Sequence, residues 1–478
     1  MSEFIRLIEG LEAGRDHIAS LRAGVEPSPP PAVSARLRQL FGREISPREA
    51  VAQIVADVRC RGDAALREYT RRIDGVDLDT LTADANAIEA AYQATHVQLK
   101  EALHLASDRI RAFHEREPGG SWLEWDDEGG ALGQLVRPLQ RVGVYVPGGR
   151  AAYPSSLLMT VIPAQVAGVE EIVVTTPPGP ESADGTDRTE SAGLPAPSIL
   201  AAARVVGLEQ VFLLGGAQAV AALAYGTESV PRVDKIVGAG GLFVTLAKKQ
   251  VYGDVGIDGL HGPTETLLIA DRTANATLAA ADLLAQAEHD PLATALLVTP
   301  SQLLAKNVQS EVNRQLPLLD RADIIAEALQ GQGAIIVVAD LNEALTLANE
   351  YAPEHLCLLV ADPWPLVGRV HNAGGVFVGQ QVSEALGDYV IGPSHVMPTG
   401  GTARFASPLH VREFLKVTSI FAPGDATTKR LAPAAEAIAR AEGLTAHAGA
   451  VAAHAAQGLP TGHSRPSIGS IGSVGSIG

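Results

Sequence analysis

The chain has 478 residues, of which 46% are hydrophobic, 19% charged and 4% aromatic; 54 Asp and Glu against 37 Lys and Arg give a formal net charge of −17. This length predicts two or more domains, and the negative charge argues against nucleic acid as a partner. Two cysteines exclude a disulfide framework, and the absence of a signal-peptide core or a membrane-spanning apolar run predicts a cytoplasmic protein with no membrane partner.

The N-terminal part is predicted to be helical. Residues 1–24 have the pattern of a short amphipathic helix, and Pro27–Pro31 form a stiff linker after it. Ser46 and Glu49 make a capping box that begins another helix. That helix is predicted to end at Gly62. Two further helices are predicted over residues 63–73 and 84–116.

From residue 136 onward, strands alternate with helices. This alternation predicts parallel sheets covered by helices, and the Ser/Gly/Pro-rich piece Pro177–Pro197 is expected to be a surface loop. Strands are predicted at 136–147, 171–176, 210–214, 235–237, 266–270, 294–299, 334–339, 355–360 and 375–379. Helices are predicted at 155–166, 199–206, 217–225, 276–289, 301–315 and 341–351.

The fold class is therefore α/β, with two Rossmann-like parallel-sheet domains, a helical N-terminal region and a small helical C-terminal segment. After Phe405 the pattern becomes helical, at 430–442 and 445–454, and this segment is too small to bury its own core. The predicted parts are 1–31 (helix and linker), 32–144 with 265–410 (a discontinuous first α/β domain), 145–264 (a second α/β domain), 411–457 (the C-terminal segment) and 458–478 (a low-complexity, disordered tail).

A candidate metal site lies at the end of the helix predicted over 276–289. Asn275 can cap this helix, and Asp290-Pro291 end it. Gln286 and His289 are three residues apart, so their side chains leave one face and can hold two corners of a metal site. The same residues would also suit an ordinary helix end.

Further acid and imidazole groups follow. Glu354-His355 lie where a turn enters a strand, so both can serve one pocket only if the turn redirects one of them; His is the usual base near neutral pH. Glu384, Asp388 and His395 lie in a Gly/Pro-punctuated segment, which is typical of a functional loop or of a hydrogen-bonded surface loop. The last such residues, Glu442 and His447, flank a helix boundary.

Nucleotide motifs are missing. Gly238–Gly241 follows a strand, but no G-x-G-x-x-G with a later acidic partner fits there, so spacing alone does not indicate NAD. A His, Asp and Gln donor set suits Zn, or less tightly Mn or Co, and one open position would make the metal catalytic.

These residues closely resemble the histidinol dehydrogenase family over about Ser46–His447. The motifs that carry the resemblance are RVGVYVPGG (141–149), GGAQAVAALAYGT (215–227), AQAEHDP (285–291), YAPEHL (351–356), GDY (387–389) and HVMPTGGTARF (395–405). The resemblance implies an oxidoreductase of histidine biosynthesis, a homodimer with shared active sites, one zinc per subunit and NAD bound by the domain 145–264. It implies oxidation of L-histidinol to L-histidine through the aldehyde, in two hydride transfers.

The resemblance also implies roles for individual residues. Glu354 would activate water, and His355 would be the proton-transfer base. Zinc would be held by Gln286, His289, Asp388 and His447, with His447 supplied by the partner subunit in the swapped segment 411–457. These ligands and His355 would also contact substrate, together with Ser155, Ser156, Thr264, Glu384, His395 and Glu442. The NAD contacts would be Tyr145, Gln218 and the position of Gly241.

The chain differs from the family pattern near the implied site. Gly241 stands where the family usually has Asn, and Thr264 stands where it usually has Ser. Gly259-Leu-His261 replaces Met-x-Ala, and Pro393-Ser394 replaces Thr-Asn. Two alternatives therefore remain open. One is a sister zinc and NAD dehydrogenase of another small polar alcohol, such as a sulfonated diol, and the other is a zinc hydrolase.

Overall fold

The computed structural model describes residues 4–22, 31–117, 119–127, 130–148, 152–179 and 193–457. Its contacts divide the chain into two units, which are described separately. Unit 1 comprises Met1–His114 with Gln140–Glu413, and unit 2 comprises Glu115–Leu139 with Phe414–Gly478. The predicted tail 458–478 lies outside the described residues, as does most of the predicted linker; Pro31 begins helix α2 (Pro31–Phe41).

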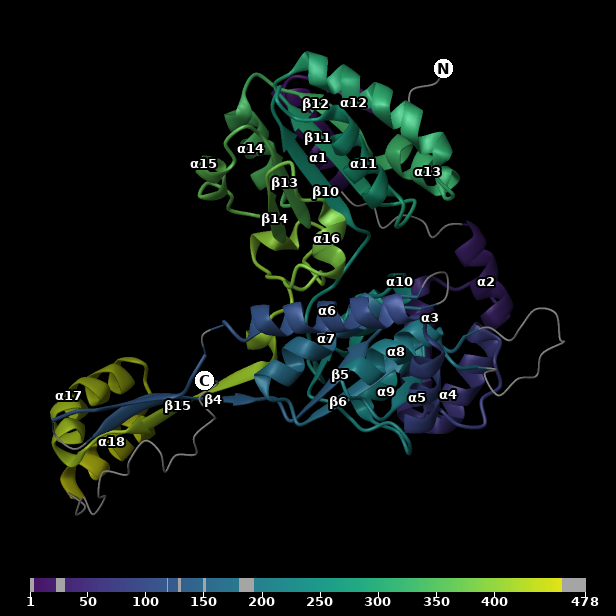
Figure 1. The fold of residues 1–478 in the computed structure, drawn as a ribbon. Helices are drawn as coiled ribbons and strands as arrows, with labels where there is room; N and C mark the ends of the chain where they lie inside the picture. The colour runs from purple at the N-terminus through teal and green to yellow at the C-terminus, as the bar shows by residue number, and fades with distance from the viewer. Residues whose placement is uncertain are drawn as a thin grey trace. The chain divides into compact units, whose positions relative to one another are not determined.

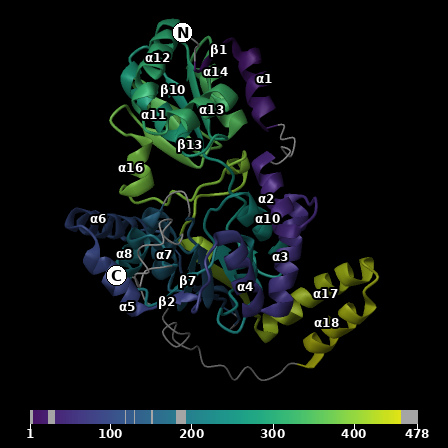
Figure 2. The ribbon, with the colours of Figure 1, turned by 90° about the vertical axis from the view of Figure 1, so that its right-hand side faces the viewer.

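The first sheet of unit 1 is entirely parallel, in the order β1-β12-β11-β10-β13-β14. Its strands are almost uniformly apolar because helices cover both faces. Helices α11, α12 and α13 pack on one face, and α1 and α14 on the other (Figures 1 and 2). The strands are β1 (Arg6–Glu9), β10 (Glu265–Ala270), β11 (Thr294–Thr299), β12 (Ala334–Val337), β13 (His355–Leu359) and β14 (Gly375–Val378). The helices are α1 (Leu11–Arg22), α11 (Ala276–Ala287), α12 (Gln302–Gln315), α13 (Ala322–Gln332), α14 (Leu341–Tyr351), α15 (Trp364–Val367) and α16 (Glu384–Tyr389).

The second sheet of unit 1 has the order β2-β7-β6-β5-β8-β9, parallel except for the β2–β7 pair. Helices α3, α4, α9 and α10 enclose one hydrophobic core with it, and α5 with α8 and α6 with α7 form further contacts (Figure 1). The strands are β2 (Thr82–Ala83), β5 (Arg141–Tyr145), β6 (Glu171–Thr176), β7 (Val211–Leu213), β8 (Lys235–Val237) and β9 (Gly256–Ile257). The helices are α3 (Pro47–Arg61), α4 (Asp63–Tyr69), the π-helix η1 (Thr70–Asp74), α5 (Ala85–Ala94), α6 (Val97–His114), α7 (Pro154–Ala167), α8 (Pro197–Val205), α9 (Gly216–Tyr225) and α10 (Leu242–Val251).

Unit 2 is a three-stranded antiparallel sheet, β15-β4-β3, with two helices. Its elements are β3 (Trp122–Trp125), β4 (Ala131–Pro138), β15 (Leu415–Ala422), α17 (Asp425–Ala441) and α18 (Thr445–Gln457). The short helices η2 (Leu316–Leu318), η3 (Thr402–Arg404) and η4 (Val411–Phe414) complete the described elements.

The predicted α/β class with two parallel sheets is confirmed, but the expected grouping of segments differs from the structure. The segment 47–114 packs on the second sheet, because Val51, Ile54 and Leu66 belong to its core. The first sheet instead includes β1, which lies within residues 1–24, a segment predicted to be helical. The predicted helix 84–116 is two helices, α5 and α6, and the C-terminal segment contains β15. In the described part of the chain, no helix has the length and apolar character needed to cross a bilayer.

Candidate active site

The turn before β13 brings Glu354 and His355 together. Ala352 ends α14 in the left-handed conformation, with φ of 53°, and is the one described residue other than glycine with positive φ. Such backbone strain is concentrated at functional sites. The turn lets the side chains of these consecutive residues approach each other, with Glu354 Oε2 3.6 Å from His355 Nδ1. From the sequence, the two residues can act together only if the turn redirects one of their side chains, and the turn does so.

Glu354 and His355 are both buried. Burial raises the pKa of Glu354 to about 7. Burial alone would lower the pKa of His355. The carboxylates of Glu354, Asp388 and Glu384 have the larger effect, so the pKa is raised to about 10. His355 Nε2 lies 3.5 Å from Asp388 Oδ1. The imidazole is thus surrounded by carboxylates that stabilise its charged form.

Thr264, just before β10, links this acid to helix α11. Its hydroxyl lies 2.7 Å from Glu354 Oε2 and 3.1 Å from Gln286 Oε1, and the Glu265 N–H donates to the same Glu354 oxygen at 3.1 Å. Asn275 caps α11 as predicted. Gln286 is buried at the end of this helix, and His289 just beyond it is exposed.

Glu384 forms a second buried acidic position. Its Oε1 accepts hydrogen bonds from the Thr266 hydroxyl and, at 2.9 Å, from the Cys357 thiol. Its Oε2 is buried without a hydrogen-bond partner among the described residues. A buried carboxylate oxygen in this state is suited to accept a hydrogen bond from a polar ligand.

His395 lies on the loop after α16. Its Nδ1 is 2.7 Å from the Asp388 carbonyl oxygen, which only accepts, so Nδ1 carries the hydrogen. Its Nε2 is then an acceptor for the Ser156 hydroxyl, 3.1 Å away on α7. Burial lowers the pKa of His395, which keeps this ring neutral near pH 7. Ser155 is buried beside Ser156 at the start of α7.

Asp388 is the acid shared by these imidazoles. Burial opposes its charge, but His355, His395 and His289 together lower its pKa, so the carboxylate is ionised. The group lies at the amino edge of the first sheet, where β10 and β13 begin. Ligands of open parallel sheets usually bind at the carboxyl edge, so this site departs from the common arrangement.

A second polar group lies at the carboxyl edge of the second sheet. There β5 continues to β6 on one side while β8 lies on the other, which creates the switch point where nucleotides bind in such folds. Tyr145, at the end of β5, accepts a hydrogen bond from the Gly216 N–H at 3.2 Å. Gln218 is fully buried, its Oε1 has no partner among the described residues, and its Nε2 is 3.4 Å from Asp74 Oδ2. Gly241 is the exposed cap of α10.

The structure thus groups most predicted site residues of unit 1 around the two edges described. The other two predicted residues, Glu442 and His447, lie in unit 2, at the end of α17 and on α18, and both are exposed. Within the described ranges, no group of three or more His, Cys, Asp and Glu side chains is arranged to hold a metal ion.

Several contacts of the site could not be found from sequence. Arg22 of α1 pairs with Glu265 through two nitrogens and donates to the Tyr351 carbonyl at 2.7 Å, so the N-terminal helix supports the residue next to Thr264. Asp74 supplies an acidic group beside Gln218, where no motif placed one. Its only local signal is the π-helical turn η1, a feature often found at functional sites.

Comparison with known proteins identifies the family. Residues 42–455 match the family model described as histidinol dehydrogenase. The chain belongs to the histidinol dehydrogenase family. It is 52% identical over 449 residues to a histidinol dehydrogenase of Deinococcus radiodurans, covering 94% of this chain and 99% of that one. A histidinol dehydrogenase of Moorella thermoacetica is 52% identical over 420 residues, covering 87% of this chain and 96% of that one.

The fold agrees with this assignment. A crystal structure of histidinol dehydrogenase from Elizabethkingia anophelis matches with a TM-score of 0.84 and 30% identity, over 95% of this chain and 98% of that one. The resemblance inferred from the motifs is therefore confirmed. Family membership identifies the chain as an oxidoreductase that acts on an alcohol and its aldehyde.

Proposed function

We propose that the chain oxidises L-histidinol to L-histidine through the aldehyde, reducing two NAD per turnover. The observation that carries this proposal is the buried Glu354-His355 pair, held by Thr264 and the Glu265 N–H in a chain of this family. An alcohol oxidation needs a base for the hydroxyl proton, and an aldehyde oxidation needs an activated water. Two adjacent groups of different proton affinity meet both needs.

His355 takes the hydroxyl proton in the first oxidation. This requires its neutral form, which the charge of Asp388 at 3.5 Å opposes. If Asp388 held a cation, part of that opposition would be removed and the pKa of His355 would be lower.

Glu354 takes a proton from water in the second oxidation. Its raised pKa, about 7, makes it a far better base than an exposed carboxylate, and half of it is ionised near neutral pH. Water adds to the aldehyde carbon as Glu354 accepts one of its protons, which leaves the anion of the hydrate. This anion loses hydride to the cofactor to give the carboxylic acid, which then releases its proton to form the carboxylate.

We propose zinc for the amino edge of the first sheet. Gln286, His289 and Asp388, with His447 of a second copy of the chain, provide the oxygen and nitrogen donors that zinc accepts. One observation supports a cation here: the Asp388 carboxylate is ionised although its side chain is only 16% exposed. When bound, zinc supplies a fixed point that orients the amine and imidazole of the substrate. Glu384, His395 and Glu442, with Ser155, Ser156 and Thr264, are proposed as the other substrate contacts.

We propose NAD for the carboxyl edge of the second sheet, in the domain 145–264. Gln218 Oε1, which is buried and unpartnered among the described residues, and the Tyr145 hydroxyl fit hydrogen-bonding groups of a nucleotide. When bound, NAD supplies the hydride acceptor. Gly241 offers a backbone N–H in place of the side chain that is usual in the family, and Asp74 adds a carboxylate suited to ribose hydroxyls.

The shared active site of a homodimer is part of the proposal. Unit 2 has few buried apolar residues, whereas Val417, Phe421 and Ile438 are 57%, 78% and 61% exposed in the single chain. A surface of this kind is suited to burial against another subunit. We propose that the segment 411–457 is exchanged between subunits and that His447 and Glu442 complete the partner's site.

The test is NADH formation followed at 340 nm with L-histidinol, L-histidinal and a panel of small polar alcohols that includes a sulfonated diol. We expect two NADH for each histidinol consumed, and loss of zinc and activity together in His289→Ala. Activity with only another alcohol would support a sister dehydrogenase, and full zinc occupancy in His289→Ala would refute the ligand set. A zinc hydrolase would form no NADH, and the family assignment already favours a dehydrogenase over it.

A further inference from the structure

A short connection joins the two sheets of unit 1. Residues 258–264 run from the end of β9 to the start of β10. Thr264, at the far end, holds Glu354 and Gln286, as described above. The other end of the connection, Asp258, holds the turn that follows β8.

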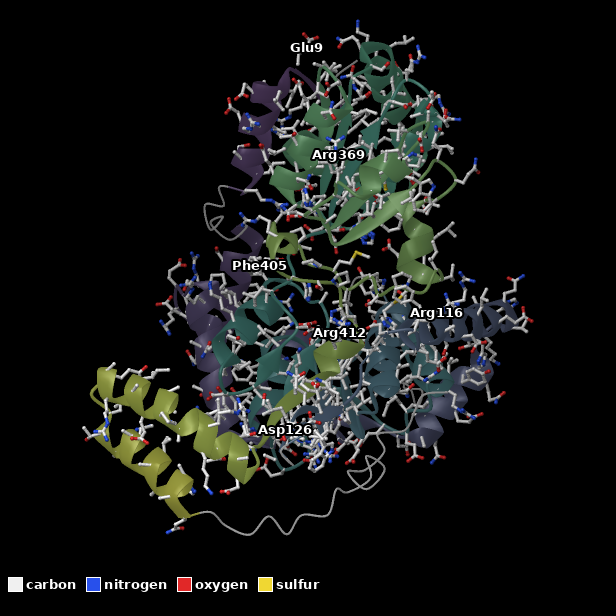
Figure 3. All side chains as sticks on the ribbon, turned by 90° about the vertical axis from the view of Figure 1, so that its left-hand side faces the viewer. Glu9, Arg116, Asp126, Arg369, Phe405 and Arg412 are labelled. Carbon is white, nitrogen blue, oxygen red and sulfur yellow. The ribbon has the colours of Figure 1, made fainter. Side chains whose placement is uncertain are left out.

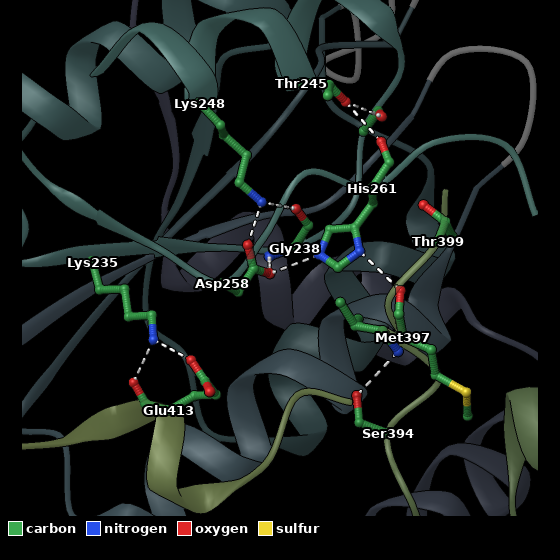
Figure 4. Close-up of polar contacts among 12 residues, drawn as sticks. Lys235, Gly238, Thr245, Lys248, Asp258, His261, Ser394, Met397, Thr399 and Glu413 are labelled. Atoms are coloured by element: carbon green, nitrogen blue, oxygen red, sulfur yellow. Dashed lines mark hydrogen bonds and ion pairs between the residues drawn. The ribbon is translucent and has the colours of Figure 1, made fainter. Parts of the chain in front are cut away.

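Asp258 and Lys248 fix the backbone of Gly238. The Gly238 N–H donates to Asp258 Oδ2 at 2.7 Å, and Lys248 Nζ donates to the Gly238 carbonyl at 3.0 Å and to Asp258 Oδ1 (Figure 4). Their side chains are 3% and 2% exposed. Gly238 has φ of 109°, and a Cβ there would lie 2.2 Å from the Tyr145 carbonyl oxygen, so the turn packs directly on the cofactor residue at the end of β5.

His261 extends this network to another loop. Its Nε2 lies 3.3 Å from Asp258 Oδ2, and its Nδ1 lies 3.0 Å from the carbonyl oxygen of Met397 (Figure 4). The next residue reinforces the bridge, since the Gly262 N–H donates to Thr399 Oγ1 at 2.6 Å. Met397 and Thr399 lie on the loop that carries His395. This loop leads into the short helix η3, after which the exposed Phe405 follows (Figure 3).

The bridge is built from buried groups with fixed partners. His261 is 9% exposed, and its own carbonyl accepts from the Thr245 hydroxyl of α10 at 2.8 Å. Burial opposes the charge of Asp258, but Lys248 and His261 lower its pKa, so the carboxylate is ionised and able to hold both neighbours. No step of the proposed reaction uses these groups.

We propose that His261 is a positioning residue that couples the Gly238 turn to the loop 394–401. The inference rests on the proposed function, in which NAD binds beside the turn and the alcohol beside His395. A ligand that orders one of two linked elements lowers the cost of ordering the other, so each ligand tightens binding of its companion by the same factor.

The test measures the coupling factor directly. Calorimetry of the zinc-loaded enzyme gives the Kd for NAD alone and with saturating L-histidine, the product, which cannot donate a further hydride. We expect L-histidine to tighten NAD binding about fivefold or more in the parent enzyme. In His261→Ala this factor should fall to within about twofold of one, and the Kd for each ligand alone should change less than the factor does.

Two variants separate coupling from a general loss of structure. His261→Asn keeps an N–H close to the Nδ1 position for the Met397 carbonyl and should retain part of the coupling. Lys235→Ala removes a comparable polar contact, to the Glu413 carboxylate and carbonyl near the other end of β8 (Figure 4), and should leave the factor unchanged.

The outcomes have distinct meanings. Equal coupling in His261→Ala and the parent enzyme would overturn the proposal, as would a parent enzyme that binds both ligands independently. A parent enzyme that binds no NAD under either condition would refute the proposed function, and the coupling with it.

Discussion

Glu354 is held where burial disfavours its charge, although the proposed reaction uses that charge. The Thr264 hydroxyl and the Glu265 N–H both donate to its Oε2, which fixes the direction of the carboxylate. These donors offset part of the burial, so the pKa of Glu354, about 7, leaves base and acid forms both populated near neutral pH. We therefore propose Glu354, and not His355, as the base that accepts a proton from water.

The first prediction separates the two oxidations. Glu354→Gln removes the base for water while keeping the shape of the side chain, so the aldehyde step should slow by about 100- to 10,000-fold and the alcohol step much less. His355→Asn should slow both steps. Single-turnover NADH formation, started from the alcohol and separately from the aldehyde, measures each. Equal losses in both half-reactions for Glu354→Gln, with His355→Asn near normal, would contradict these roles.

The second prediction concerns Arg22. Its guanidinium pairs with Glu265, whose side chain is 8% exposed, so Arg22→Ala leaves a buried carboxylate without its cation. We expect a loss of about 3 kcal/mol in the free energy of unfolding, measured by denaturant titration. Adding Glu265→Gln to Arg22→Ala should recover part of the lost unfolding free energy, because the unpaired buried carboxylate is then replaced by a neutral amide. Arg15→Ala, which breaks an exposed pair with Glu350, should have a much smaller effect.

Most of the candidate site could be predicted from residue type and motif, but its supports could not. Glu354, His355, Glu384, Asp388 and His395 lie in segments whose local chemistry is visible in the sequence. Arg22 and Glu265 are separated by 243 positions, and no local pattern indicates that a helix end will meet that strand. Contacts of this kind depend on the order of strands in the sheet.

At the scale of elements, prediction succeeded where a cap and an apolar period agree. The capping box of Ser46 and Glu49 begins α3, and Asn275 begins α11, as expected. β1 was predicted as helix because four residues carry too little period-2 signal, and only pairing with β12 makes them a strand. β15 was also predicted wrongly. Its side chains are mostly exposed in the single chain, so they lack the apolar alternation of a half-buried strand.

The third prediction tests the helix that carries Gln286. Asn275 Oδ1 accepts from the Thr277 N–H at 2.9 Å and more weakly from the Leu278 N–H. Asn275→Ala leaves these donors to water and should cost about 1 kcal/mol of unfolding free energy, measured by denaturant titration. Asn275→Ser, which can still cap, should remain close to the parent. Equal stability of the Ala variant and the parent would mean that packing alone holds the helix start.

At the scale of the molecule, two sheets contribute opposite edges to function. The proposed cofactor residues lie at the carboxyl edge of the second sheet, and the proposed catalytic pair lies at the amino edge of the first. Neither sheet alone contains both sets. The grouping of segments into sheets was only partly predictable. Residues 47–114 are mostly helical, and the sequence pattern of a helix does not indicate which of the two sheets the helix packs on.

The last prediction concerns the subunits. If His447 of one chain completes the zinc site of another, His289→Ala and His447→Ala are each inactive as homodimers. A mixed dimer then holds one site with both substitutions and one with neither, so mixing the two variants should restore activity. With random exchange of equal amounts, half of the dimers are mixed and each has one intact site, so about a quarter of parental activity is expected. Differently tagged subunits, co-purified after mixing, verify the exchange. Verified mixed dimers without activity would place His447 outside the partner's site, whereas the same mixture of His289→Ala with Asp388→Ala, both on unit 1, should stay inactive in either case.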